Sequence, residues 1–190
     1  NLGGVPAEAH RIRTPAAEIE SFSSRNWVGV NAEKAALVSI YDGVAEVVAQ
    51  GGRMKVEKGY GVRVAYGQPP ETPRPLPAAP LGITVDDDGG VLPGGRTRLS
   101  WKGDSPRYVV QVASDARFRS PVVHAEVGAP ELEADLADGP FWVRVLAVDP
   151  VGLKGEFSEP VAIAVRRMEP LTDLNLLLQA TGGVFVTPKS

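Results

Sequence analysis

The chain has 190 residues, a formal net charge of −3 and no cysteine, with 17 prolines and 21 glycines. Without cysteine, disulfides, cysteine nucleophiles and thiolate metal sites are excluded. The slight negative charge and scattered basic residues argue against a nucleic-acid partner. No window approaches 18 uninterrupted apolar residues, so no membrane span is predicted. The many turn-forming residues favour an all-β fold, in a chain long enough for two small domains.

Short strands separated by glycine turns are predicted in the first half of the chain. Asp42-Gly43 tolerates the positive φ of a type I′ turn, so residues 36–41 and 44–49 are expected to form a hairpin. Gln50, Gly51 and Gly52 give the next turn. The predicted domain covers residues 1–67, and its meander of strands comprises residues 27–30, 36–41, 44–49, 54–57 and 62–66.

Proline dominates residues 68–80, which read QPPETPRPLPAAP with six prolines among thirteen residues. Proline fixes φ and lacks an amide donor, so we expect extended polyproline II that enters no sheet. The segment is interpreted as a semi-rigid linker between domains. Recognition by a PxxP-reading module is the alternative.

Residues 81–168 are predicted to form a second all-β domain. Residues 139–159 read GPFWVRVLAVDPVGLKGEFSE, in which alternation over 141–148 predicts a strand and residues 149–152 a turn into a second strand. Trp101 and Trp142 are interpreted as core residues. About seven short strands with regular turns are typical of an immunoglobulin-like sandwich, and they fall at residues 81–85, 98–101, 108–113, 122–127, 131–136, 141–148 and 160–165.

The C-terminal extension, residues 169–190, changes character. Leu171, Leu174 and Leu178 fall on one face of a short predicted helix. Gly182 and Gly183 would end that helix, and residues 184–186 could follow as a strand. The simplest interpretation is a helical turn that packs back on one of the domains.

Residues that could carry chemistry are few. His10 and His124 have no carboxylate at helical spacing and set up no metal pair. The sequence contains neither a nucleophile elbow nor a phosphate-binding loop. Residues 86–88 are consecutive aspartates, but the twelfth position of an EF-hand beginning there is Thr97, so a solvated turn is expected.

Two further groups of side chains could form a site. Glu131 and Glu133 share one strand face without other support for glycoside chemistry. The sequence therefore predicts no enzyme, with no catalytic, cofactor-binding or metal-ligating residue and no cofactor. Aromatic side chains remain the only ligand platform, with Trp27, Tyr60, Tyr66 and Trp142 as candidates.

Three motifs of the second half belong together: LSW at 99–101, YVVQVA at 108–113, and FWVRVLAVD at 141–149 followed by GLKGEFSEPV. On these motifs, residues 98–165 resemble a fibronectin type III domain. This resemblance implies a β-sandwich. Such sandwiches serve as spacers and as binding modules, so the resemblance implies no particular function.

The first half also carries a set of motifs: TPAAEI at 14–19, ALVSIYDGVAEVVAQGG at 36–52, KGYGV at 58–62, GQPP at 67–70 and LPAAP at 76–80. On these motifs, residues 14–80 resemble a FecR-type domain. The chain departs from the family at 19–27, where IESFSSRNW replaces the usual V-R-G-T-x-F step. It also shows neither the anti-sigma segment nor the membrane span of the signalling regulator. The resemblance therefore implies an extracytoplasmic relative that binds envelope components.

Together these features predict a non-enzymatic extracytoplasmic interaction or signalling module, periplasmic or otherwise in the bacterial envelope, that binds a protein or cell-envelope partner. A carbohydrate- or peptidoglycan-binding module and a passive structural spacer are the alternatives. The glycan-binding alternative requires a planar row of exposed aromatics on one sheet face. The spacer requires no surface patch of several hundred Å². The partner and the oligomeric state are not encoded in any recognisable motif.

Overall fold

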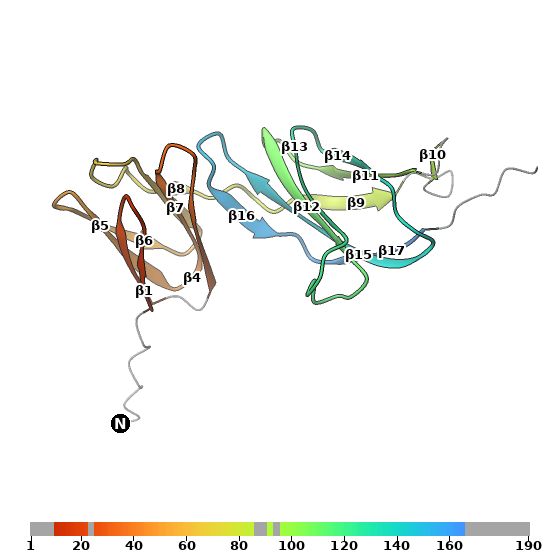
Figure 1. Ribbon diagram of the computed structural model, residues 1–190, viewed down its shortest axis with the longest axis horizontal. Helices are drawn as coiled ribbons and strands as arrows, with labels where there is room; N and C mark the ends of the chain where they lie inside the picture. Colours follow the sequence, from red (N-terminus) through yellow and green to blue (C-terminus); the bar gives the residue numbers. More distant parts are fainter. Residues whose placement is uncertain (1–9, 23–24, 86–90, 93–95, 166–190) are drawn as a thin grey trace, which may run out of the picture.

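A computed structural model describes residues 10–22, 25–85, 91–92 and 96–165. Every regular element in these residues is a β-strand, which confirms the predicted all-β fold class. The strands form two sandwiches that lie end to end along the long axis of the molecule (Figure 1). Within the described residues, no helix is long and apolar enough to cross a membrane.

The N-terminal sandwich consists of two antiparallel four-stranded sheets, and β-branched and alanine side chains fill the space between them. Ile19, Val38, Val47 and Val62 are fully buried there. One sheet contains, in spatial order, β1 (His10–Arg13), β2 (Glu18–Ser21), β5 (Val44–Ala49) and β6 (Gly52–Glu57). The other contains β3 (Arg25–Val30), β4 (Ala36–Asp42), β7 (Tyr60–Val64) and β8 (Arg74–Pro75).

The chain changes sheets at Gly43, where φ is +75°, so the predicted hairpin of residues 36–41 and 44–49 is wrong. β4 pairs with β3 and β7, whereas β5 pairs with β2 and β6. Each strand already has two neighbours, and the tight turn serves as a corner between sheets. The next predicted turn is confirmed, because Gln50 and Gly51 both have positive φ and join β5 to β6.

The proline-rich segment enters a sheet, contrary to the prediction that it would not. Arg74 and Pro75 form β8 opposite Gly61 and Tyr60 of β7. The amides between the prolines remain available, and that of Leu76 donates to the Gly59 carbonyl at 2.8 Å. β8 lies at the edge of its sheet, where proline is tolerated because one side of the strand needs no donor.

The C-terminal sandwich also has two antiparallel sheets. Its core includes Leu99, Trp101, Tyr108 and Val145, and the Trp101 and Tyr108 rings meet edge to face with centroids 5.5 Å apart. One sheet contains β9 (Leu81–Val85), β10 (Val91–Leu92), β11 (Arg96–Lys102) and β14 (Glu131–Ala134). The other contains β13 (Val123–Val127), β12 (Arg107–Ala113), β15 (Gly139–Val148), β16 (Lys154–Phe157) and β17 (Val161–Val165).

The core prediction is right for Trp101 and wrong for Trp142. Side chains alternate across a strand, so Phe141, Val143 and Val145 face the core while Trp142 faces outward. Trp142 is half-buried on the outer face of the sheet, opposite Ala113. The predictions for residues 86–88 and 169–190 fall outside the described residues.

Candidate functional site

The two sandwiches meet where the β15–β16 turn packs on the outer face of the β3-β4-β7-β8 sheet (Figure 1). We call this contact the junction. Leu153, at the tip of the turn, is fully buried, and its Cδ1 would lie 3.0 Å from a β-carbon built on Gly61. Leu37 approaches Gly152 in the same way. Glycine at 61 and 152 thus allows the apolar tip to reach the neighbouring sheet.

Polar contacts surround this apolar contact. The Tyr41 hydroxyl donates to the Lys154 carbonyl at 3.1 Å. Arg25 Nη2 lies 3.0 Å from Glu156 Oε1. A β-carbon on Gly155 would collide with the Pro77 carbonyl oxygen, so β16 and the proline-rich segment touch backbone to backbone. The junction therefore combines close packing with directional bonds, and it fixes one sandwich against the other.

Trp27 and Lys154 form a contact across the junction. The Lys154 ammonium lies 4.7 Å from the centroid of the Trp27 ring, within cation–π range. The indole lies against Gly29, where a β-carbon would clash with it. No carboxylate of the described residues is within 4 Å of Lys154 Nζ, because none of the ion pairs among them includes it. Lys154 thus offers a cation to a further partner.

Two hollows open along the junction, and Trp27 and Lys154 line both. We call the two together the trough. The first hollow has a volume of about 570 Å³ and is lined by Trp27, Val30, Asn31, Glu33, Leu37, Arg63, Arg107, Glu126, Val148, Pro150, Val151, Gly152 and Lys154. The second has a volume of about 470 Å³ and is lined by Arg25, Asn26, Trp27, Tyr41, Val109, Gln111, His124, Arg144, Leu146, Lys154, Gly155, Glu156, Phe157 and Glu159.

Arg144 is the second cation of the trough that touches aromatic faces. Its guanidinium lies 4.2 Å from the Phe118 ring centroid and 4.1 Å from that of Phe157. Its Nε donates to Gln111 Oε1 at 2.8 Å, and Gln111 Nε2 donates to His124 Nδ1 at 3.1 Å. Burial lowers the pKa of Arg144 from its usual range. The guanidinium is thus held rigidly on the outer face of the sheet.

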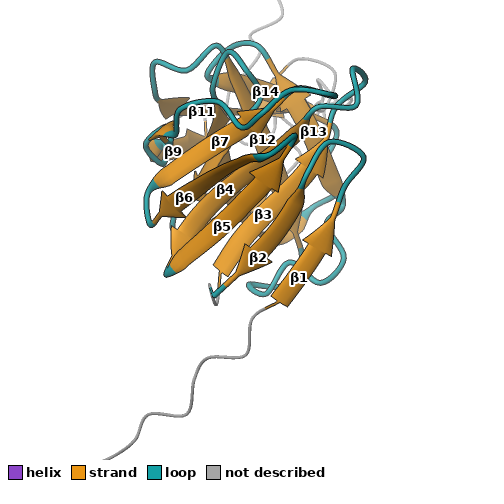
Figure 2. Cartoon of the chain, turned by 90° about the vertical axis from the view of Figure 1, so that its left-hand side faces the viewer, coloured by secondary structure: helices purple, strands orange, loops and turns teal. Residues whose placement is uncertain are grey.

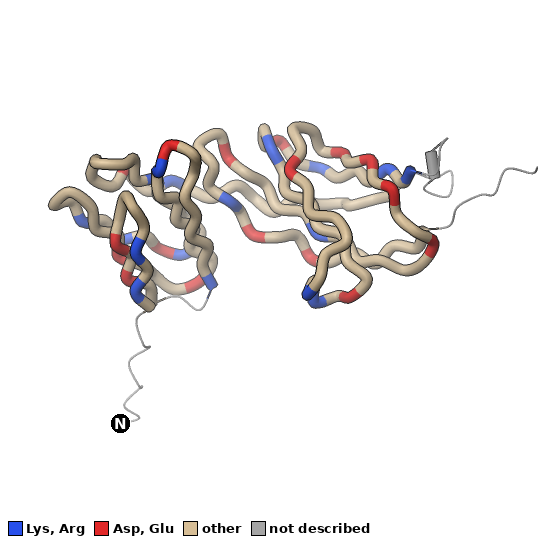
Figure 3. The backbone as a smooth tube through the Cα atoms, viewed as in Figure 1, with Lys and Arg blue, Asp and Glu red and all other residues tan. Residues whose placement is uncertain are grey.

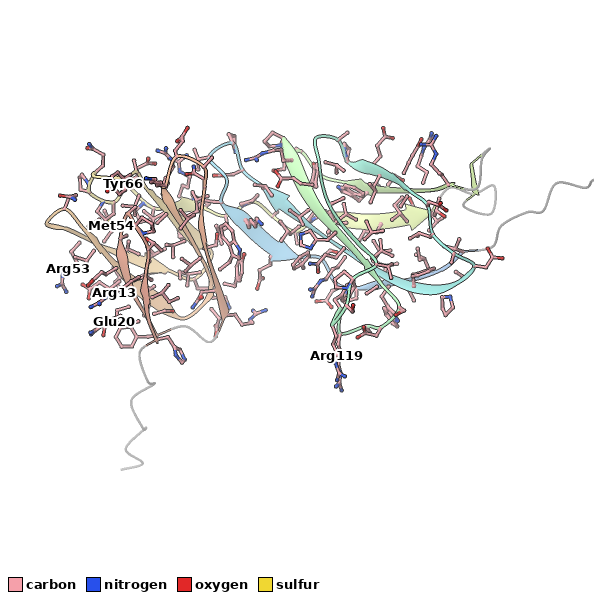
Figure 4. The ribbon with its side chains drawn as sticks, viewed as in Figure 1. Arg13, Glu20, Arg53, Met54, Tyr66 and Arg119 are labelled. Atoms are coloured by element: carbon pink, nitrogen blue, oxygen red, sulfur yellow. The ribbon has the colours of Figure 1, made fainter. Side chains whose placement is uncertain are left out.

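Only some of the sequence-derived candidates come together here. Trp27 lines the trough, whereas Tyr60 and Tyr66 are exposed at opposite ends of β7. Figure 4 shows Tyr66 at the outer part of the N-terminal sandwich. Trp142 does not line either hollow.

The titratable candidates are dispersed. His124 is exposed and lines the second hollow, while His10 lies on β1. Glu133 binds Arg98, whose hydrogen bond lowers the pKa of that carboxyl. Among the described residues, no group of three or more His, Asp or Glu is arranged to hold a metal ion.

Lys154, Tyr41 and Arg144 are not singled out by the sequence, because each acquires its neighbours from strands distant in the chain. The one local signal is the G-L-K-G sequence of residues 152–155, in which two glycines flank a large apolar residue and a lysine. Glycine permits close backbone approach. Such spacing within a hairpin indicates a contact with another element.

No family model matches this chain, and no curated protein matches it. The FecR-type resemblance of residues 14–80 is therefore unsupported by a family model. An Fn3-like protein from Clostridium thermocellum is 18% identical over 50% of this chain and 99% of its own, with a TM-score of 0.38. Domains A168–A170 of titin are 14% identical over 80% of this chain and 56% of theirs, with a TM-score of 0.40. An extracellular domain from B. thetaiotaomicron is 7% identical over 83% of this chain and 29% of its own, with a TM-score of 0.30.

Tyr41 gives the junction a predicted pH dependence. Burial raises the pKa of this phenol from 10.0 to about 12, and the charge of Glu156 adds to the rise. The stabilisation of the neutral phenol is complete below the unfolded pKa of 10.0 and is lost as the pH rises towards 12. Tyr41→Phe should lose about 1 kcal/mol with the hydrogen bond to Lys154. As the pH rises from 10.0 to about 12, the free energy of unfolding of Tyr41→Phe should also fall less than that of the wild type.

Urea unfolding of both proteins across the alkaline range measures this difference. Absorbance titration of the tyrosines provides an independent reading, because the phenol that ionises at a pH of about 12 should be missing in the variant. Equal alkaline losses in the two proteins would contradict the role of Tyr41 at the junction.

Proposed function

We propose that this chain is a non-enzymatic extracytoplasmic module of the FecR type, which binds a protein or cell-envelope partner. In this proposal residues 1–67 and 81–168 are its two domains, and residues 68–80 connect them. The supporting observation is the junction, where Leu153, the Tyr41 hydrogen bond and the Arg25–Glu156 pair join the sandwiches beside an open trough. Two linked sandwiches with a preformed trough suit recognition of a partner by both at once.

The surface supports a protein partner better than a glycan. The large exposed aromatics of the described residues are Phe22, Tyr60 and Tyr66. Phe22 follows β2 in one sheet and Tyr60 begins β7 in the other, whereas Tyr66 lies beyond the far end of β7, so the three do not form a row on one sheet face. Trp27 has Gly29 on one side and the Lys154 ammonium over its ring. A sugar ring would therefore find no free indole face here. Charges of both signs are interspersed along the two sandwiches (Figure 3), with no extended basic field.

Site-specific cross-linking in the producing cell tests this function. Val30 is an exposed residue of the trough, and a photoreactive amino acid at this position should form an adduct with one discrete protein. The matched control is Val122, which is similarly exposed but lines neither hollow. The proposal is supported by an adduct that forms only at position 30. That adduct should also be accessible to a reagent that does not cross the inner membrane. Equal adducts at both positions, or none, would favour the passive spacer.

A further inference from the structure

We propose that the trough holds an extended acidic segment of the partner protein, which adds as a strand to the free edge of β3 and places carboxylates beside Lys154 and Arg144. This inference rests on the proposed function and specifies the chemistry of its partner. It follows from three properties of the trough: the residues that β3 contributes to its lining, the edge of β3 from Asn26 to Val30, and the distribution of charge.

β3 supplies one wall of the trough along its length. Arg25 and Asn26 line the second hollow, Trp27 lines both, and Val30 lines the first. A strand of six residues is about 20 Å long, so a peptide paired along β3 would be of similar length. β13, an edge strand of the C-terminal sandwich that lies behind the N-terminal sandwich in Figure 2, contributes Glu126 to the first hollow and His124 to the second. Edge strands of both sandwiches therefore line the trough.

The edge of β3 is suited to pairing. Among the described residues β3 pairs only with β4, so from Asn26 to Val30 the backbone groups on its other side have no strand partner in the part of the chain that the structure describes. From Asn26 to Val30 it keeps a regular register, and it contains no proline. Prolines, bulges and inward charges are the usual protection of an edge strand, and this stretch has none of them. Addition of a peptide strand to such an edge is a common mode of recognition.

Charge in the trough favours an acidic peptide. Its lining contains five basic side chains and four carboxylates, although the whole chain has a net charge of −3. Three ion pairs account for most of them: Arg25 with Glu156 at 3.0 Å, Arg63 with Glu33 at 3.0 Å, and Arg107 with Glu126 at 2.8 Å. The remainder are Lys154, Arg144 and the exposed Glu159 that follows β16.

Lys154 and Arg144 contact aromatic faces and have no carboxylate within 4 Å among the described residues. Both line the second hollow. Because each is already held in place, little side-chain freedom is lost when a carboxylate binds. Two fixed cations beside a free strand edge therefore select a peptide that alternates acidic and other residues, since alternate side chains of a strand face the same side.

A labelled octapeptide of alternating valine and glutamate with blocked ends serves as the probe, and fluorescence anisotropy with the whole chain measures its binding. We expect binding that weakens at high salt. The same peptide with lysine in place of glutamate should not bind. The acidic peptide with alternate amides methylated should also fail, because it cannot donate to β3. Equal binding of the acidic and basic peptides, or no binding of the acidic one, would overturn the inference.

Substitutions in the trough test whether the peptide binds there. Lys154→Gln should weaken binding about tenfold, as expected for loss of one charge-assisted contact. Lys102→Gln is the matched control, since Lys102 is exposed on β11 in the opposite sheet. Val30→Lys adds a cation at the trough and should tighten binding about threefold, without disturbing the junction. Unchanged binding in both trough variants would show that the peptide binds elsewhere. If position 30 forms a specific adduct but the peptide does not bind, the proposed function is retained and only the inference of an acidic strand is rejected.

Discussion

Replacement of Leu153 with alanine is expected to release the two sandwiches from each other. The side chain is fully buried at the junction and belongs to neither of the two main hydrophobic cores. Its removal leaves a cavity beside Gly61, and such a change in a buried position costs about 2–5 kcal/mol. Because the residues of both cores are unchanged, the lost free energy should weaken the contact between the sandwiches more than it destabilises either sandwich.

Distance measurements between spin labels can separate these two effects. The chain has no cysteine, so cysteines introduced at Lys55 on β6 and Lys102 on β11 would be the only attachment points. We expect a narrow distance distribution in the parent and a broad one after Leu153→Ala. Leu99→Ala is the matched control, because Leu99 is equally buried but lies in the core of the C-terminal sandwich. It should lower stability while the distribution stays narrow. A narrow distribution in Leu153→Ala would mean that other contacts suffice to hold the junction.

The strands of the C-terminal sandwich could be predicted because local patterns in the sequence specify them. Alternation over residues 141–148 places Phe141 and Val143 in the core, and the turn at residues 149–152 is closed by the Asp149 side chain, which accepts from the Leu153 amide at 2.8 Å. Such patterns depend on backbone geometry and burial of one face. The prediction that Trp142 is a core residue was wrong because alternation alone does not show which of the two sets of side chains faces the core.

The junction was missed because its partners are far apart in sequence. Tyr41 and Lys154 are separated by 113 positions, and a single sequence contains no record of such a pairing. Besides the G-L-K-G sequence, a second signal was present: residues 35–40 read AALVSI, an almost continuous apolar run rather than an alternation. A run of this kind indicates a strand covered on both faces. Leu37 and Ser39 are indeed buried on the outer face of β4, under the β15–β16 turn.

The hairpin predicted at Asp42-Gly43 was wrong for the same reason, because strand pairing there depends on residues distant in the chain. A tight turn with positive φ can join two paired strands or carry the chain from one sheet to the next, and the local residues are alike in both cases. The choice depends on the other strands available for pairing. β2, β3, β6 and β7 occupy the edges of β4 and β5, which leaves no edge for the two to share.

Gly155→Ala is expected to open the junction by adding a single methyl group. The new β-carbon would collide with the Pro77 carbonyl oxygen, and backbone cannot move aside as the end of a flexible side chain can. Overpacking of this kind costs about 1–3 kcal/mol. Gly128→Ala is the matched control: neither glycine has positive φ, and the nearest atom to a β-carbon at 128 is the Pro106 carbonyl oxygen at 3.9 Å. The control should keep or slightly raise stability, because alanine restricts the unfolded chain.

A double-mutant cycle with Leu153→Ala shows where the added methyl group acts. If both changes act through the junction, Gly155→Ala should cost less once Leu153→Ala has already loosened it, and the urea-derived free energies should fall short of additivity. Full additivity would mean that the added methyl group destabilises β16 itself rather than the contact between the sandwiches. In that case the Gly155–Pro77 contact would not hold the sandwiches together, and the junction would depend on Leu153, the Tyr41 hydrogen bond and the Arg25–Glu156 pair.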